Sequence, residues 1–71
     1  MVAYRSSTDR LIGDTGIIIE PIPGDRLGRG VIKVGGQLWS AESDWPESLA
    51  VGTRVLIVGR SGLILRVLPE S

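Results

Sequence analysis

The sequence contains no cysteine, histidine, asparagine or phenylalanine. Without cysteine and histidine the chain has no disulfides, lacks the usual sulfur and nitrogen ligands for metals, and lacks the commonest general base. Without asparagine it has no N-glycosylation site. Most familiar catalytic arrangements cannot be built from the remaining residue types. We therefore expect no catalytic residues, no metal site and no bound cofactor.

The sequence also has no excess of charge of one sign and no long hydrophobic run. Eight Lys and Arg residues balance eight Asp and Glu residues, which gives a formal net charge of zero. A protein that binds nucleic acid regardless of sequence needs an excess positive field, so the balance argues against such a function. The apolar runs are far shorter than the ~20 residues of a membrane span, and no signal peptide is visible. We expect this segment itself not to enter a membrane.

The residues that are abundant favour β-structure. Valine and isoleucine, both branched at Cβ, total 15 of the 71 residues, and leucine adds eight, whereas alanine occurs three times. Side chains branched at Cβ suit a pleated sheet better than a helix. Ten glycines and four prolines interrupt the apolar runs before any reaches the length of an ordinary helix. The chain has room for one domain, which we predict to be all-β.

Turn signals divide the chain into five expected strands, namely residues 15–20, 30–34, 37–41, 53–58 and 63–68. Gly35-Gly36 predicts a tight hairpin between the second and third strands, because glycine tolerates the positive φ that such turns require. Residues 42–52 predict a loop or a single helical turn. An open sheet of this composition would leave an apolar face and two edges in water, so we predict a small closed barrel. The pattern leaves the order of the strands open.

Alternation along the strands predicts which side chains face the barrel interior. The fourth strand is nearly all apolar, so we expect both of its faces to be covered. The predicted inward set is Ile17, Ile19, Ile32, Val34, Trp39, Ala41, Val55, Ile57, Leu63, Leu65 and Val67.

The acidic residues Glu42, Asp44 and Glu47 surround Trp45. They could form an acid/base pair or a site for a hard cation, because both need several carboxylate oxygens. The spacing does not match a calcium-binding loop, so we favour a solvated loop. The serines have no histidine to activate them. An enzyme would require these three carboxylates to converge on a cleft.

Trp45 is the one large apolar residue in this polar loop, next to Pro46. It could plug one end of the barrel, or it could be an exposed anchor for a protein partner, because tryptophan and arginine are enriched at interface hot spots. In the second case Arg54 and Arg60, which bracket the fourth strand, would form its rim. Trp39 shares a face with Ala41, which favours a place in the core over a role in stacking bases.

Several segments together resemble the C-terminal soluble domain of the NfeD-like family. They are residues 11–16 (LIGDTG), 30–36 (GVIKVGG), 38–43 (LWSAES), 52–58 (GTRVLIV) and 62–67 (GLILRV). The similarity extends from about Leu11 to Pro69. One departure is the segment from Gly24 to Arg29, which is longer than the usual turn before the second strand.

The resemblance implies a five-stranded OB-fold barrel over residues 11–69, with a lead-in or linker stub at residues 1–10 and a tail at residues 70–71. It also implies a non-catalytic interaction domain of a membrane-anchored protein, with partners of the stomatin or flotillin type. Its expected role is regulation of membrane protease activity or organisation of membrane microdomains. The anchor would be transmembrane segments outside this sequence, and the cytoplasmic side is favoured. The alternative is weak binding of single-stranded nucleic acid or oligosaccharide by the barrel face.

Overall fold

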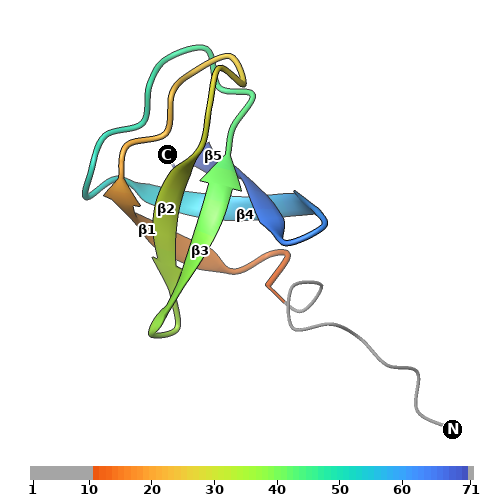
Figure 1. Ribbon diagram of the computed structural model, residues 1–71. Helices are drawn as coiled ribbons and strands as arrows, with labels where there is room; N and C mark the ends of the chain where they lie inside the picture. Colours follow the sequence, from red (N-terminus) through yellow and green to blue (C-terminus); the bar gives the residue numbers. More distant parts are fainter. Residues whose placement is uncertain (1–10, 71) are drawn as a thin grey trace, which may run out of the picture.

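The computed structural model describes residues 11–70, which form a closed five-stranded barrel (Figure 1). The strands are β1 (Thr15–Glu20), β2 (Gly30–Val34), β3 (Gln37–Glu42), β4 (Arg54–Ser61) and β5 (Ile64–Pro69). Their order around the barrel is β1-β2-β3-β5-β4, and β4 pairs with β1 to close it. The predicted all-β class and the predicted barrel are confirmed. The lead-in predicted for residues 1–10 lies outside the described residues.

Glycine turns determine two of the connections. Gly35 and Gly36, with φ of 55° and 87°, join β2 to β3. Positive φ at both central residues is the signature of a type I′ hairpin turn, so the predicted hairpin is confirmed. The β4–β5 turn falls at Gly62 and Leu63, because β4 continues to Ser61, three residues beyond the predicted end.

One pair of neighbouring strands in the barrel is parallel. Residues 43–53 carry the chain from the end of β3 to β4, and β5 then returns beside β3 in the same direction, with Ala41 opposite Leu65. All other pairings are antiparallel. This arrangement, with β1 paired to both β2 and β4, is that of an OB-fold barrel. Closure leaves no strand of the sheet with a free edge along its whole length.

The interior is aliphatic. Its buried hydrophobic residues are Ile18, Ile22, Ile32, Val34, Ala41, Leu49, Val55, Ile57, Leu65 and Val67. Trp39 is half-buried and packs against this core.

The predicted inward set was wrong in β1. Ile18 is fully buried opposite Ile32, while Ile17 and Ile19 are exposed. With three consecutive isoleucines, the strand can face either Ile18 or the pair Ile17 and Ile19 toward the interior and still bury isoleucine. A shift of one residue exchanges the two faces. Gly16 carries the missing signal, because a Cβ there would lie 2.9 Å from Val34 Cγ2. Gly16 therefore faces inward, and alternation then places Ile18 in the core.

Two further expectations about burial were wrong. Leu63 lies in the β4–β5 turn and is exposed. The outer face of β4 is not covered, because Leu56 and Val58 are 38% and 41% exposed. A barrel of this size has an interior wide enough for only one layer of side chains from each strand, so the second apolar face of β4 stays on the surface.

Two long connections lie side by side over one end of the barrel (Figure 1). Residues 21–29 link β1 to β2, and residues 43–53 link β3 to β4. Ile22 and Leu49 form an isolated antiparallel bridge between them, with backbone hydrogen bonds of 3.0 and 2.8 Å. Both side chains are buried, so they cover the open end of the core. The second connection is an irregular loop without the single helical turn that was one of its two predicted forms.

Candidate functional site

Trp45 lies in the β3–β4 connection, and its side chain is 39% exposed. Its backbone N–H donates to Ser43 Oγ at 3.1 Å, and its carbonyl accepts from the Asp25 N–H at 2.8 Å. The tryptophan is therefore held from its own connection and from the neighbouring one. The side chain stays partly in solvent, as the anchor suggested by the sequence requires.

Ser43 is the buried polar residue that fixes this loop to the barrel. Its Oγ donates to the Val67 carbonyl at 2.6 Å and accepts from the Trp45 N–H. Its own carbonyl accepts from the Arg26 N–H at 3.1 Å. A buried hydroxyl with both its donor and its acceptor functions satisfied favours a single local conformation. Ser43 thus connects β5 to the loop that contains Trp45 (residues 43–53, called the Trp45 loop below) and to the β1–β2 connection.

An ion pair joins the two connections at the surface. Arg26 Nε donates to Asp44 Oδ1, and Nη2 donates to Oδ2 at 3.3 Å. The hydrogen bond from Arg26 is the main cause that lowers the pKa of Asp44, and the same bond raises the pKa of the guanidinium. Both side chains are well exposed, so the pair orients the loops more than it stabilises the fold.

The β1–β2 connection carries features that sequence reasoning missed. Asp25 and Arg26 both adopt left-handed backbone conformations, with φ of 55° and 59°. Such conformations are uncommon outside glycine and are maintained only by their surroundings. Here a Cβ on Gly24 would lie 2.4 Å from the Pro46 carbonyl oxygen, so the two connections are in close contact. The turn projects Leu27, which is 81% exposed. An isolated leucine among charged residues was the only sequence signal for it.

Arg54 and Arg60 lie at opposite ends of β4 and point to separate parts of the surface. Six residues of strand place them about 20 Å apart. Arg54 pairs with Glu70, with Nε and Oε1 3.7 Å apart, and lines an open pocket beside β1. Arg60 Nη1 donates to the Gly62 carbonyl at 3.3 Å, at the β4–β5 turn. The structure therefore separates these two arginines from each other.

The three loop carboxylates do not gather into one cluster. Glu42 is the last residue of β3 and is half-buried, Asp44 is engaged by Arg26, and Glu47 is exposed. Within residues 11–70, no group of three or more acidic side chains is placed to hold a metal ion.

Trp39 is the aromatic residue of the described strands. It is half-buried against the core, and its indole nitrogen is buried without a hydrogen-bond partner among the described residues. A base-stacking platform needs aromatic faces open to solvent. The geometry of Trp39 therefore gives no support to the alternative of nucleic-acid binding.

Within the described part of the chain, no helix has the length and apolar character needed to cross a membrane.

Comparisons with known proteins identify the family. Residues 8–69 match the sequence profile of the NfeD-like C-terminal, partner-binding domain. No curated protein sequence matches the chain. Among solved structures, one similar chain is the C-terminal domain of stomatin operon partner protein 1510-C from Pyrococcus horikoshii. The identity is 33% and the TM-score 0.79, with 94% of this chain and 98% of that chain covered.

Two further structures belong to bacterial proteins. One is the soluble domain of a membrane protein implicated in regulation of membrane protease activity from Corynebacterium glutamicum, with 26% identity, a TM-score of 0.80, and 92% and 100% of the two chains covered. The other is the soluble domain of the NfeD protein YuaF from Bacillus subtilis, with 35% identity, a TM-score of 0.72, and coverage of 87% and 76%. The resemblance noted in the sequence is confirmed. The chain belongs to the family of NfeD-like C-terminal, partner-binding domains.

Proposed function

We propose that this domain is a non-catalytic module that binds a stomatin- or flotillin-like membrane protein and thereby takes part in regulating a membrane protease or in organising a membrane microdomain. Its family is that of a partner-binding domain, and similar chains are a stomatin operon partner and a protein implicated in membrane protease regulation. One similar solved chain is the soluble domain of a membrane protein, which supports a position beside a membrane.

The observation that carries the proposal is a large apolar side chain held partly in solvent by a fixed loop. Trp45 is anchored through Ser43 and Asp25, and Leu27 is exposed two residues beyond Asp25. An ordered aromatic side chain loses little conformational entropy on binding, which is why such residues dominate interface energetics. Arg54 and Arg60 lie at opposite ends of β4, where we expect them to contribute through charge at the margin of a larger contact.

The test is a binding measurement between the full chain and a stomatin-like membrane protein of the same organism in detergent or nanodiscs. We expect Trp45→Ala to weaken binding at least about 30-fold, as for a hot-spot residue. The control is Leu38→Ala, which removes an exposed apolar side chain elsewhere on the surface, in β3. It should change the affinity less than about twofold. Arg54→Gln and Arg60→Gln should each weaken binding less than about fivefold. Equal affinities for the Trp45 and Leu38 variants would contradict the assignment of the surface.

Binding of single-stranded nucleic acid by the barrel face is the competing function. A titration of the same protein with oligothymidylate at low salt tests it, because binding through phosphates would fall steeply as salt is raised. Saturable binding of this kind, together with no affinity for the stomatin-like protein, would replace the protein-interaction proposal.

A further inference from the structure

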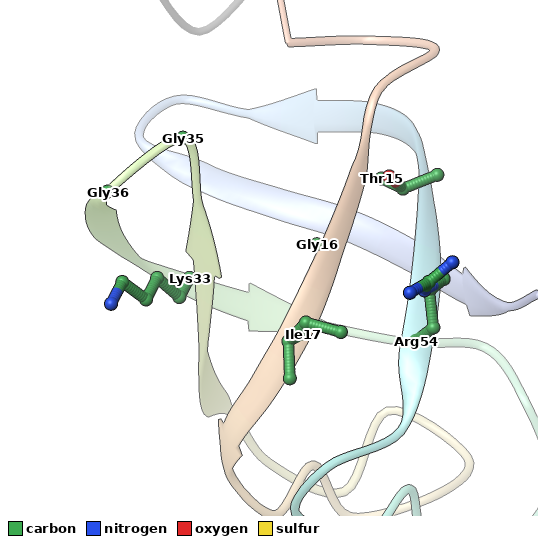
Figure 2. Close-up of a pocket in the computed structure, with 7 residues that line it drawn as sticks. All are labelled: Thr15, Gly16, Ile17, Lys33, Gly35, Gly36 and Arg54. Carbon is green, nitrogen blue, oxygen red and sulfur yellow. The ribbon is translucent and has the colours of Figure 1, made fainter.

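An open pocket of about 420 Å³ lies on the outer surface of β1 (Figure 2), where the hairpin of β2 and β3 and the beginning of β4 also contribute. Its lining residues are Thr15, Gly16, Ile17, Lys33, Gly35, Gly36 and Arg54. Neither Trp45 nor Arg60 is among them. The pocket is therefore a separate feature from the Trp45 loop.

The register of three strands creates its charge pattern. Ile17 in β1 pairs with Lys33 in β2 on one side and with Arg54 in β4 on the other. Residues directly opposite each other in a sheet point to the same face, so the three side chains form one row across the surface. Figure 2 shows Lys33 and Arg54 on opposite sides of Ile17. Two strand spacings place their backbones about 10 Å apart.

The floor and walls leave room for a ligand. Ile17 is 37% exposed between the two cations, so its apolar surface is available for contact. At Gly35 and Gly36 no atom lies within 4 Å of the position that a Cβ would take. The hairpin side of the pocket is thus low and open. None of the seven lining side chains is acidic, so the pocket presents two positive charges around an apolar centre.

Arg54 already engages one carboxylate. Glu70, which follows β5, lies with Oε1 3.7 Å from Arg54 Nε, and both side chains are largely exposed. An ion pair of this length in solvent contributes little, so a second carboxylate could replace it at small cost. The same arginine can therefore pair with a carboxylate of another molecule.

From these observations we infer that the pocket binds an extended acidic segment of a protein partner, with an apolar side chain over Ile17 and a carboxylate near each of Lys33 and Arg54. The inference deepens the proposed function, because it says that the partner carries an acidic extended segment. It rests on the proposed function only in assuming that the ligand is a protein. In an extended segment, residues i, i+2 and i+4 share one face and span about 13 Å, which suits two long cationic side chains on either side of one apolar residue.

The probe is the peptide acetyl-Gly-Glu-Ser-Leu-Ser-Glu-Gly-amide, titrated into the isotopically labelled full chain and followed by amide chemical shifts. We expect saturable shifts centred on residues 15–17, 33–36 and 54, and an affinity that falls as salt is raised. The same peptide with Gln in place of both Glu residues should bind at least about tenfold more weakly. Shifts centred elsewhere, no shifts at all, or equal binding of the Gln peptide would overturn the inference.

Variants separate a specific pocket from general charge attraction. Lys33→Gln and Arg54→Gln should each weaken peptide binding about threefold to fivefold. Arg29→Gln removes the same charge at the other end of β2 and is the matched control, for which we expect less than a twofold change. Glu70→Gln should strengthen binding about twofold, because it removes the competing carboxylate. Equal losses for the three cationic variants would show non-specific attraction and refute the pocket.

Two measurements exclude other occupants. Vesicles of phosphatidylserine should not compete with the peptide, and binding to vesicles with no binding of the peptide would assign the cations to a lipid surface instead. The amide shifts of the protein alone should not depend on its concentration, and dependence confined to the pocket would identify a second copy as the occupant.

Trp45→Ala should leave peptide binding unchanged. Failure of the pocket and failure of the Trp45 surface are thus observed separately.

Discussion

Replacing Ser43 with alanine should destabilise the domain more than its small size suggests. The hydroxyl is fully buried, donates to the Val67 carbonyl at 2.6 Å and accepts from the Trp45 N–H at 3.1 Å. The substitution removes two hydrogen bonds and leaves the Val67 carbonyl without that partner. A buried polar group deprived of its partner costs about 1–3 kcal/mol, and the second hydrogen bond contributes about 0.5–1.5 kcal/mol. We expect a total loss of about 2–4 kcal/mol.

The measurement is reversible unfolding by urea and by heat, followed by far-UV circular dichroism. For a domain of this size, the expected loss lowers the melting temperature by roughly 10–25 °C. The urea midpoint should fall while the slope of free energy against urea stays constant, because the surface exposed on unfolding hardly changes. Ser40→Ala is the matched control, since Ser40 is an exposed serine of β3, three residues before Ser43. Its stability should stay within about 0.5 kcal/mol of the wild type.

One outcome would refute this reasoning directly. If Ser43→Ala unfolds at the same urea concentration as Ser40→Ala, then the hydroxyl does not fix the Trp45 loop to β5. The anchored position of Trp45, and with it the main support for the proposed interaction surface, would then be lost.

Three further predictions concern the phase of β1, the close contact between the end of β1 and the start of β2, and the surface ion pair. Ile18→Ala should lower the free energy of unfolding by about 2–5 kcal/mol, because it creates a cavity in the core. Ile17→Ala should lower it by less than about 1 kcal/mol, because Ile17 is exposed. Equal losses of stability in urea unfolding would contradict the observed phase of β1. Gly30→Ala should cost about 1–3 kcal/mol, since its Cβ would lie 2.4 Å from two backbone oxygens, whereas Gly59→Ala meets open space and should be neutral within about 0.5 kcal/mol in the same assay. The lowered pKa of Asp44 means that its ion pair stabilises the fold above the usual carboxyl range and that this contribution disappears as pH falls through the lowered pKa. Unfolding midpoints of the wild type and Asp44→Asn should therefore differ at neutral pH and converge as the pH falls below the usual carboxyl range, and a constant difference across the titration would argue against the pair.

The strand positions were largely predictable, because the signals for them are local. Gly35-Gly36 predicts its hairpin from backbone preference alone, and the bounds of β1 and β2 agree with the prediction. Errors arose at Ile17, Ile18 and Ile19, where each residue is equally apolar and the pattern has no phase of its own. The exposed faces of Leu56 and Val58 were also missed, because composition does not show how many layers of side chains a closed barrel can hold.

The candidate surface was predictable in part. Trp45 stands out in the sequence as an apolar residue among acidic ones, whereas its fixed position depends on Ser43 and Asp25, which are close to it only in the folded chain. Lys33 and Arg54 are 21 residues apart in the sequence, and no spacing rule joins them. They lie on either side of Ile17 because β1 pairs with both β2 and β4.

The sequence by itself determined the class of this protein. Branched aliphatic residues divided by glycine and proline specify short strands and tight turns, and the lack of histidine and cysteine removes the commonest catalytic and metal-binding groups, because both depend on residue chemistry alone. Tertiary structure decided which isoleucine faces the core, how two connections hold Trp45 partly in solvent, and which cations share a pocket. These features depend on strand register and barrel closure, which form only when segments distant in the sequence pair with one another.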